Sequence, residues 1–320
     1  MRIPALMALL CAAALAACSG GSSKPADTAI TVGFSQVGAE SEWRTANTRS
    51  VKESLAEPAF RLKFSDGQQK QENQIKALRS FIAQRVDVIA FSPVVETGWD
   101  TVLQEAKAAG IPVVLTDRTV NADPSLYVTL IGSDFVEEGR RAARWLIEDS
   151  AGRAGPIRVV ELQGTVGSAP ANDRMKGFLE VIGKDSRFQI VRSQSGDFTR
   201  TKGKEVMEAF IKAEGQKKID VLFAHNDDMA IGAIQAIEEA GLKPGEDIHI
   251  VSIDGVRGAF EAMKAGKLNA TIECNPLLGA QLAQLIRDVH AGTPVPKRVV
   301  VEEGVFTREQ AAAELPNRKY

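Results

Sequence analysis

The sequence predicts an α/β protein made of two similar doubly wound, Rossmann-like lobes joined by several crossing segments. From Ile30 onward, short β-branched runs alternate with longer helical patterns, as in a parallel sheet covered by helices. The same order of segments then occurs a second time. The length of 320 residues suits two domains, and a composition of 44% hydrophobic and 25% charged residues excludes a disordered chain.

The first lobe is predicted from its regular alternation of strands and helices. Residues 86–91 are the clearest strand, because only Asp87 is polar and a buried parallel strand is apolar on both faces. The third helix ends at Gly110, a residue type that often terminates helices. We expect strands at 30–34, 60–64, 86–91, 111–116 and 126–131, and helices at 43–57, 69–84 and 97–109.

The second half of the chain repeats segments of the first in the same order. Residues 157–167 resemble 30–38, and residues 219–224 resemble 86–91. A single match could arise by chance, but the preserved order at an offset of about 130 residues favours two copies of one architecture. Further strands are expected at 269–274 and 298–306, with a helix at 277–291. The expected lobes are 29–131 plus about 276–298, and 132–275 plus about 299–320.

Residues 1–18 are predicted to be an export signal. Arg2 precedes an apolar run that is too short to span a bilayer and ends in small residues. Leu15-Ala16-Ala17-Cys18 resembles a bacterial lipobox, in which the cysteine is lipidated; a plain signal peptide is the alternative. Residues 19–28 would then be a flexible tether. We expect a periplasmic protein anchored through lipidated Cys18, with the outer membrane favoured because Ser19 follows it.

The candidate site consists of polar and aromatic residues at the predicted strand ends, where ligands bind in open α/β sheets. Carboxylates and amides bind hydroxyl groups, arginine offers a planar pair of donors, and flat rings can cover the C–H face of a sugar. This mixture suits a neutral polyol, whereas an anion would favour fewer carboxylates. The candidates are Ser35, Trp43, Arg44, Asp117, Arg118, Arg174, Asp197, Phe198, Asn226 and Asp254, with Asp66 as a secondary candidate.

Structural roles are the alternatives for several candidates. Asp117 and Arg118 could form a surface ion pair that contributes little. Trp43 could belong to the core, although its charged neighbours favour a solvent-facing start of a helix. The residues that precede helical patterns, and could therefore cap a helix, are Asp66, Asn226 and Asp254.

At these residues the chain resembles the periplasmic sugar-binding proteins of ABC importers, of the ribose/galactose-binding type, over about residues 29–320. The segments that carry this resemblance are 114–118, 223–229 and 251–255. Within the family the galactofuranose-binding type is most similar, at residues 32–38, 66–76, 160–167, 193–200 and 203–207.

The resemblance implies a type I periplasmic binding protein fold and a sugar site between the lobes. It places on the sugar the residues Asp117, Arg118, Arg174, Phe198, Asn226 and Asp254. The polar residue that the relatives carry near 269–274 corresponds here to Cys274 or Glu273, which makes Cys274 a second secondary candidate.

The function implied by the resemblance is that of a solute-binding lipoprotein, not an enzyme. It would close on a monosaccharide such as galactofuranose or a related aldose and deliver it to an ABC permease, as a monomer without cofactor or metal. Another sugar such as ribose or arabinose, or a role as a chemoreceptor partner, is the alternative.

Two other classes of protein fit the sequence less well. A sugar-responsive repressor needs an N-terminal helix-turn-helix where this chain has an export signal, and a net charge of −2 gives no basis for binding nucleic acid. A glycosidase could use two carboxylates of Asp66, Asp117 and Asp254, but the sequence contains no nucleophile–base motif and no HExxH metal pair. His225 lies near two aspartates at a spacing that fits no standard metal site.

Overall fold

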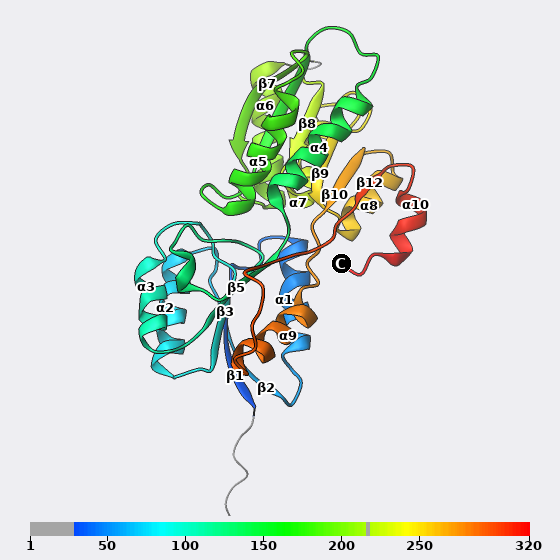
Figure 1. The fold of residues 1–320 in the computed structure, drawn as a ribbon. Coiled ribbons are helices and arrows are strands. Elements are labelled where there is room, and N and C mark those ends of the chain that lie inside the picture. Colours follow the sequence, from blue (N-terminus) through cyan, green and yellow to red (C-terminus); the bar gives the residue numbers. More distant parts are fainter. Residues whose placement is uncertain (1–28, 216–217) are drawn as a thin grey trace, which may run out of the picture.

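The computed structural model describes residues 29–215 and 218–320. It consists of two lobes, each built on a six-stranded sheet and connected by three crossing segments (Figure 1). The sheets have equivalent strand orders, β11-β5-β4-β3-β1-β2 and β12-β10-β9-β8-β6-β7. This equivalence confirms the predicted α/β fold of two similar doubly wound lobes. The predicted export signal, the tether up to residue 28 and Cys18 lie outside the described residues.

The N-terminal lobe has a fully parallel sheet. Its strands are β1 (Ile30–Gln36), β2 (Phe60–Asp66), β3 (Val88–Phe91), β4 (Val113–Thr116), β5 (Thr129–Gly132) and β11 (Arg298–Val300). Its helices are α1 (Glu42–Ser54), α2 (Gln71–Ala83), α3 (Asp100–Ala108) and α9 (Gly279–His290), with a 3₁₀ turn at Pro124–Leu126.

The C-terminal lobe repeats this arrangement, except that its last strand pairs in the antiparallel direction. The strands are β6 (Ile157–Gln163), β7 (Phe188–Ser195), β8 (Val221–Ala224), β9 (His249–Asp254), β10 (Ala270–Glu273) and β12 (Val305–Thr307). The helices are α4 (Phe135–Asp149), α5 (Ala169–Ile182), α6 (Arg200–Glu214), α7 (Asp227–Glu239), α8 (Arg257–Lys264) and α10 (Ala311–Glu314), with a 3₁₀ turn at Leu315–Asn317.

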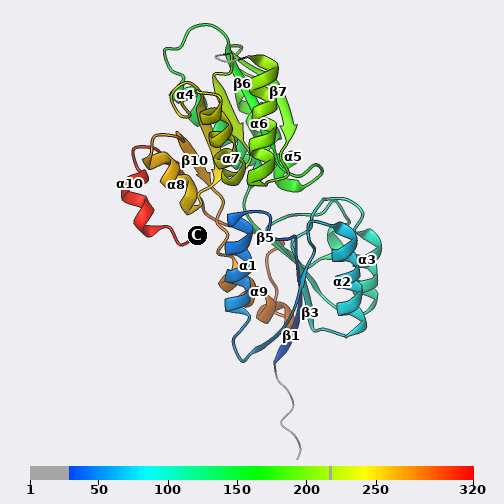
Figure 2. The same ribbon diagram turned by 180° about the vertical axis from the view of Figure 1, so that it is seen from behind.

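Both faces of the first sheet are covered by helices, which explains its apolar strands. On one face Phe81 of α2 and Leu103 of α3 pack with Leu115 of β4 in one core cluster. On the other face Val51 of α1 and Ile286 of α9 belong to a second cluster with the strands. All four residues of β3 are buried, as expected for a central strand of a parallel sheet. Figure 2 shows α1 and α9 side by side on the second face.

The expected strand at 298–306 is in fact two strands that belong to different sheets. Residues 298–300 pair with β5, so Val299 and Val300 lie in the first sheet, beyond the predicted lobe limit of 298. Residues 305–307 pair with β10 in the other lobe. The intervening residues 301–304 cross between the lobes, and a continuous strand could not pair with both sheets.

Three segments therefore join the lobes. The first follows β5 and contains Ser133, the second follows β10 and contains Cys274 and Asn275, and the third lies between β11 and β12 and contains Glu303. All three run through the same region between the lobes in Figure 1. The predicted hinge of several crossings is thus present.

Candidate functional site

A cavity lined by residues of both lobes lies between them. The loops that line it follow the carboxyl ends of strands in both sheets, where open α/β sheets bind ligands. The N-terminal lobe contributes Glu40, Ser41, Trp43, Arg44, Asp117 and Arg118; the C-terminal lobe contributes Phe135, Pro170, Arg174, Phe198, Asn226 and Asp254; and Cys274 comes from the second crossing segment. Nine of these residues are among the site residues that were predicted from the sequence.

A buried network of arginines and carboxylates forms the N-terminal wall of the cavity. Arg44 Nη2 donates to Asp117 Oδ2 at 2.7 Å, and Arg44 Nε donates to Glu40 Oε1 at 3.1 Å. Ser92 Oγ also donates to Asp117 Oδ2, at 3.0 Å. Asp117 is therefore paired chiefly with Arg44 and is only 4% exposed, so the alternative of a surface pair with Arg118 is wrong.

Arg118 has spare donor capacity towards the cavity. Its Nη1 donates to the Val94 carbonyl at 3.1 Å, whereas its buried Nε has no hydrogen-bond partner among the described residues. Burial and the nearby Arg44 guanidinium lower the pKa of Arg118 to about 10. A buried donor without a partner is costly, and a hydroxyl group in the cavity could accept from it.

The C-terminal wall is organised around Arg174 on α5. Its Nε donates to Glu138 Oε2 at 2.7 Å, and its Nη1 donates to the carbonyl of His225 at 2.5 Å. Asp254 Oδ1 lies 3.7 Å from Nη2 of Arg174. Burial raises the pKa of Asp254 well above its usual value, although Arg174 opposes this shift. A carboxyl group that holds a proton can both donate and accept, which suits recognition of a hydroxyl group.

Three aromatic rings complete the cavity. The Arg44 guanidinium lies over the Trp43 ring at 4.7 Å, and Arg118 and Arg174 lie over Phe198 at 5.3 and 5.9 Å. Trp43 is only 4% exposed, so the expected solvent-facing position is wrong. The second crossing segment covers the start of α1, because Trp43 Nε1 donates to the Cys274 carbonyl at 2.6 Å.

Three residues of the cavity wall have a strained backbone, out of seven non-glycine residues with positive φ among the described residues. Asp117 has φ 64°, Phe198 has φ 62° and Asp254 has φ 133°, values that disfavour residues with a side chain. Asp117 follows β4 and Asp254 is the last residue of β9, and these two strands occupy equivalent places in the two sheets. Strain of this kind persists where the surrounding structure enforces it, commonly at binding sites.

Three predicted site residues do not line the cavity. Ser35 is fully buried within the sheet on β1, and its hydroxyl has no partner among the described residues. Asp66 accepts from the Gln68 backbone in an exposed turn. Asp197 is engaged with Ser195 Oγ at 3.1 Å, next to the strained Phe198. A position next to a strand end therefore does not by itself place a residue in the cavity wall, since the direction of each side chain decides whether it reaches the cavity.

Asn226 combines a structural role with a place in the cavity wall. Its Oδ1 accepts from Met229 N and caps α7, while its Nδ2 donates to the Phe198 carbonyl at 3.1 Å. Of the other two residues proposed as caps, Asp254 precedes α8 by three positions, and Val256 occupies the capping position. Asp66 likewise caps no helix, since Lys70 precedes α2.

Four residues of the cavity wall were not among the candidates predicted from the sequence. Glu40 and Ser41 precede α1, and Ser41 Oγ caps this helix by accepting from Arg44 N. Phe135 and Pro170 stand at the first turns of α4 and α5. Helix starts that follow strand ends could have identified them, because a helix N-terminus at this edge of a sheet faces the ligand site.

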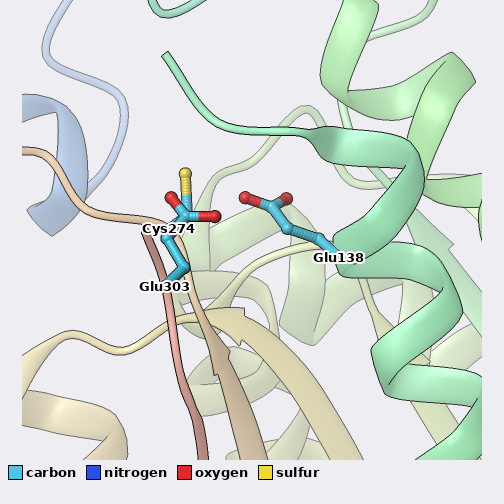
Figure 3. A group of neighbouring side chains, drawn as sticks. All are labelled: Glu138, Cys274 and Glu303. Carbon is cyan, nitrogen blue, oxygen red and sulfur yellow. The ribbon is translucent and has the colours of Figure 1, made fainter. Parts of the chain in front are cut away.

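Glu138, Cys274 and Glu303 form the one group of potential metal ligands found among the described residues. Their ligand atoms lie within 4.8 Å of one another, and the two carboxyl groups face each other in Figure 3. Hydrogen bonds already engage both carboxyl groups, since Glu138 accepts from Arg174, and Glu303 accepts from Asn275 N at 3.0 Å. We therefore describe this group as a hydrogen-bonded cluster beside the cavity.

Direct hydrogen bonds also join the two lobes. The Glu42 backbone N–H donates to Asp228 Oδ2 at 2.7 Å on one side. On the other side Asn172 Nδ2 donates to Glu96 Oε2 at 2.6 Å, and Glu96 N donates to the Gly167 carbonyl at 2.9 Å. The two lobes that line the cavity are thus in direct contact with each other. Over the described residues, no helix combines the length and apolar character needed to cross a bilayer.

Comparison with known proteins agrees with this architecture. Residues 32–294 match the model of the periplasmic binding protein domain family. The chain is 52% identical over 293 residues to the galactofuranose-binding protein YtfQ of Escherichia coli K12, with 91% of this chain and 92% of that protein covered.

Two solved structures with bound furanose sugars are also similar. A Mycobacterium smegmatis protein in complex with β-D-fucofuranose is 56% identical with a TM-score of 0.89, covering 91% of this chain and 96% of that one. The periplasmic component of an arabinose ABC transporter from Shewanella sp. ANA-3, bound to α- and β-L-arabinofuranose, is 52% identical with a TM-score of 0.87, covering 90% and 95%. With a family match over most of its length and the fold that this family shares, the chain belongs to the periplasmic binding proteins.

Proposed function

We propose that this protein is the extracytoplasmic solute-binding component of an ABC importer and that it binds a monosaccharide in its furanose form, galactofuranose or a related aldose. It encloses the sugar between its lobes and presents the closed form to a permease. It acts as a monomer, catalyses no reaction, needs no cofactor and is held at the membrane by a lipid on Cys18, with the outer membrane favoured.

The observation that carries this proposal is the composition of the cavity between the lobes. Three buried arginines alternate with the carboxyl groups of Asp117 and Asp254, and aromatic rings lie beside them. Such a wall offers donors and acceptors in every direction, as a ring with several hydroxyl groups requires. Both lobes contribute to this wall, so a ligand held there would contact residues of each lobe.

The relatives support the furanose assignment. The names of the similar proteins mention galactofuranose, fucofuranose and arabinofuranose. At 52% and 56% identity over about nine-tenths of the chain, a shared class of ligand is the simplest inference.

Isothermal titration calorimetry of the purified protein against a panel of monosaccharides tests the proposal. The panel contains D-galactose, D-fucose, L-arabinose and D-ribose, with an amino acid and a dipeptide as controls. We expect saturable binding of one or a few aldoses and an unchanged sugar by mass spectrometry. Response to the amino acid or dipeptide alone would reject a sugar ligand, and a new product would reject a pure binding role.

The ring form needs a separate measurement. A sugar labelled with ¹³C at C1 gives separate carbon resonances for its furanose and pyranose forms. We expect the protein to select the furanose resonances from the equilibrium mixture. Selection of pyranose resonances would leave a sugar-binding protein but contradict the furanose assignment.

A further inference from the structure

We propose that Glu303 is a positioning residue for sugar binding, because its carboxyl group ties together the three segments that connect the lobes. This inference rests on the proposed function. Glu303 lies outside the residues that line the cavity, so it would act on the sugar through the hinge.

The tie consists of one contact from each crossing segment. Ser133 of the first segment donates its hydroxyl to Glu303 Oε1, and the backbone N–H of Asn275 in the second segment donates to the same oxygen at 3.0 Å. Glu303 itself belongs to the third segment. Cys274 Sγ lies 3.3 Å from Ser133 Oγ, which adds a further contact between the first two segments. We call Ser133, Cys274, Asn275 and Glu303 the hinge clamp.

The hinge clamp is connected to the cavity by direct contacts. Cys274 lines the cavity, and its carbonyl accepts from Trp43 Nε1 at 2.6 Å. The carboxyl group of Glu138 faces that of Glu303 (Figure 3) and accepts from Arg174 at 2.7 Å. The Oε1 atom of Glu138 is buried and has no hydrogen-bond partner among the described residues. A shift in any crossing segment would therefore move groups that line the cavity.

Closing and opening of the lobes must change backbone torsions in all three crossing segments at once. The hydrogen bonds to one carboxyl oxygen hold the three segments at fixed distances from one another. The lobes then close in one relative orientation. Without the tie, more orientations of the lobes become accessible, and a smaller fraction of the population is competent to bind. The apparent dissociation constant rises in proportion to that lost fraction.

The test compares Glu303→Ala and Glu303→Gln with the matched control Glu302→Gln, in the full-length purified protein. Glu302 is the exposed neighbour of Glu303 in the same segment. The ligand is D-galactose or L-arabinose, whichever the unmodified protein binds. The readouts are the dissociation constant, the dissociation rate by stopped flow, and small-angle scattering with and without sugar.

We expect Glu303→Ala to raise the dissociation constant roughly five- to tenfold, the range for losing hydrogen bonds to a buried group. The dissociation rate should rise by a similar factor, and sugar should produce less compaction. Glu303→Gln keeps the accepting oxygen and should restore binding to within about twofold, and Glu302→Gln should behave like the unmodified protein. Thermal melting reports separately on the stability of each variant.

The inference would be overturned if Glu303→Ala had the same dissociation constant, dissociation rate and sugar-induced compaction as the unmodified protein. If Glu303→Ala does not fold, Ser133→Ala removes one arm of the tie alone and should show the same effects at a smaller size; unchanged behaviour of that variant would equally overturn it. Failure of the unmodified protein to bind any monosaccharide would instead reject the proposed function, and this outcome is distinct because it appears before any variant is made.

Discussion

Arg44 and Asp117 form an ion pair in which both side chains are almost completely withdrawn from solvent. Their Nη2 and Oδ2 atoms are 2.7 Å apart, and the side chains are 2% and 5% exposed. Arg44 lies on α1 and Asp117 follows β4, so the pair joins two elements that are distant in the sequence. Two opposite charges in this setting stabilise each other, and Glu40 is a second buried carboxylate partner of Arg44 at 3.1 Å.

Replacing Asp117 should therefore damage the protein in two ways. Asp117→Ala removes the shorter of the two ion pairs of buried Arg44 and leaves Glu40 as its remaining carboxylate partner, which should lower the free energy of unfolding by about 1.5–3 kcal/mol. It should also weaken sugar binding by about 1.5–3 kcal/mol if the carboxyl group accepts from the ligand. Urea unfolding and calorimetry measure the two effects. Asp100→Ala, an exposed carboxyl in the same lobe, should change neither, and equal binding by both variants would show that Asp117 does not contact the sugar.

Arg174 should not be replaceable by lysine. Its guanidinium bonds to Glu138 and to the His225 carbonyl in different directions at once, and an ammonium on a flexible stem does not have this planar geometry. We expect Arg174→Lys to weaken binding at least tenfold in calorimetry. Arg140→Lys changes a half-exposed ion pair on α4 and should leave affinity within about twofold. An affinity close to normal for Arg174→Lys would mean that charge alone suffices.

Gly164 should control the position of an aromatic ring without contacting the ligand. A Cβ atom at this residue would lie 1.9 Å from Cζ of Phe198, and no other residue type avoids that overlap. We expect Gly164→Ala to displace the ring and weaken sugar binding about tenfold or more, since Phe198 lines the cavity. Gly152→Ala, where a Cβ meets open space, should lower stability slightly and leave binding unchanged. Calorimetry measures the affinity of both variants for the sugar. Normal affinity of Gly164→Ala would mean that the position of the Phe198 ring is unimportant for binding.

Stability should fall as the pH rises from about 4.5 to 8. Burial and the neighbouring Glu138 raise the pKa of Glu303 to about 8, with Arg174 opposing the shift. Cys274 and Arg298 also face this carboxyl group. The folded protein therefore retains a proton that the unfolded chain releases above its ordinary pKa of 4.5, so the unfolded state is favoured increasingly as the pH rises through this window.

The size of this effect should be on the order of 1–3 kcal/mol. Urea unfolding between pH 5 and 9 measures it. Glu303→Gln, which cannot release the proton, should lack this part of the pH dependence, while Glu302→Gln should retain it. Parallel profiles for the two variants would mean that other groups cause the dependence.

The proposed lipid anchor depends on Cys18. Cys18→Ala should release the protein from the membrane fraction of bacterial cells into the soluble periplasmic fraction, because no other covalent lipid site is proposed. Detection of both forms with antibody after fractionation measures this change. Cys274→Ala is the matched control and should remain with the membrane; retention of Cys18→Ala there would argue against lipidation.

The sequence predicted the repeated α/β architecture because periodicity and strand composition are local properties. Residues 86–91 read as a buried strand without knowledge of their neighbours, and the preserved order of the repeats indicated two lobes. The end of the chain was harder to predict from the sequence. Only the strands with which they pair, which are distant in the sequence, distinguish β11 in one sheet from β12 in the other.

Much of the cavity wall was predicted for a similar reason, from polar residues that follow strands. Asp117 and Asp254 line the cavity, whereas Asp66 accepts from a backbone N–H in an exposed turn. Composition alone does not reveal that difference. The hinge clamp was also inaccessible, because Ser133, Cys274 and Glu303 meet only when three separate crossings converge.

The edge strands β11 and β12 have a consequence for synthesis of the chain. Residues 298–300 complete the first sheet and residues 305–307 complete the second. Neither sheet is therefore complete before these residues have been synthesised. A chain that stops before Arg298 would leave β5 and β10, which are interior strands in the complete sheets, as unpaired edges, and such edges invite aggregation. Neither lobe can therefore finish its sheet while the rest of the chain is still being made, and the two lobes reach their final form together.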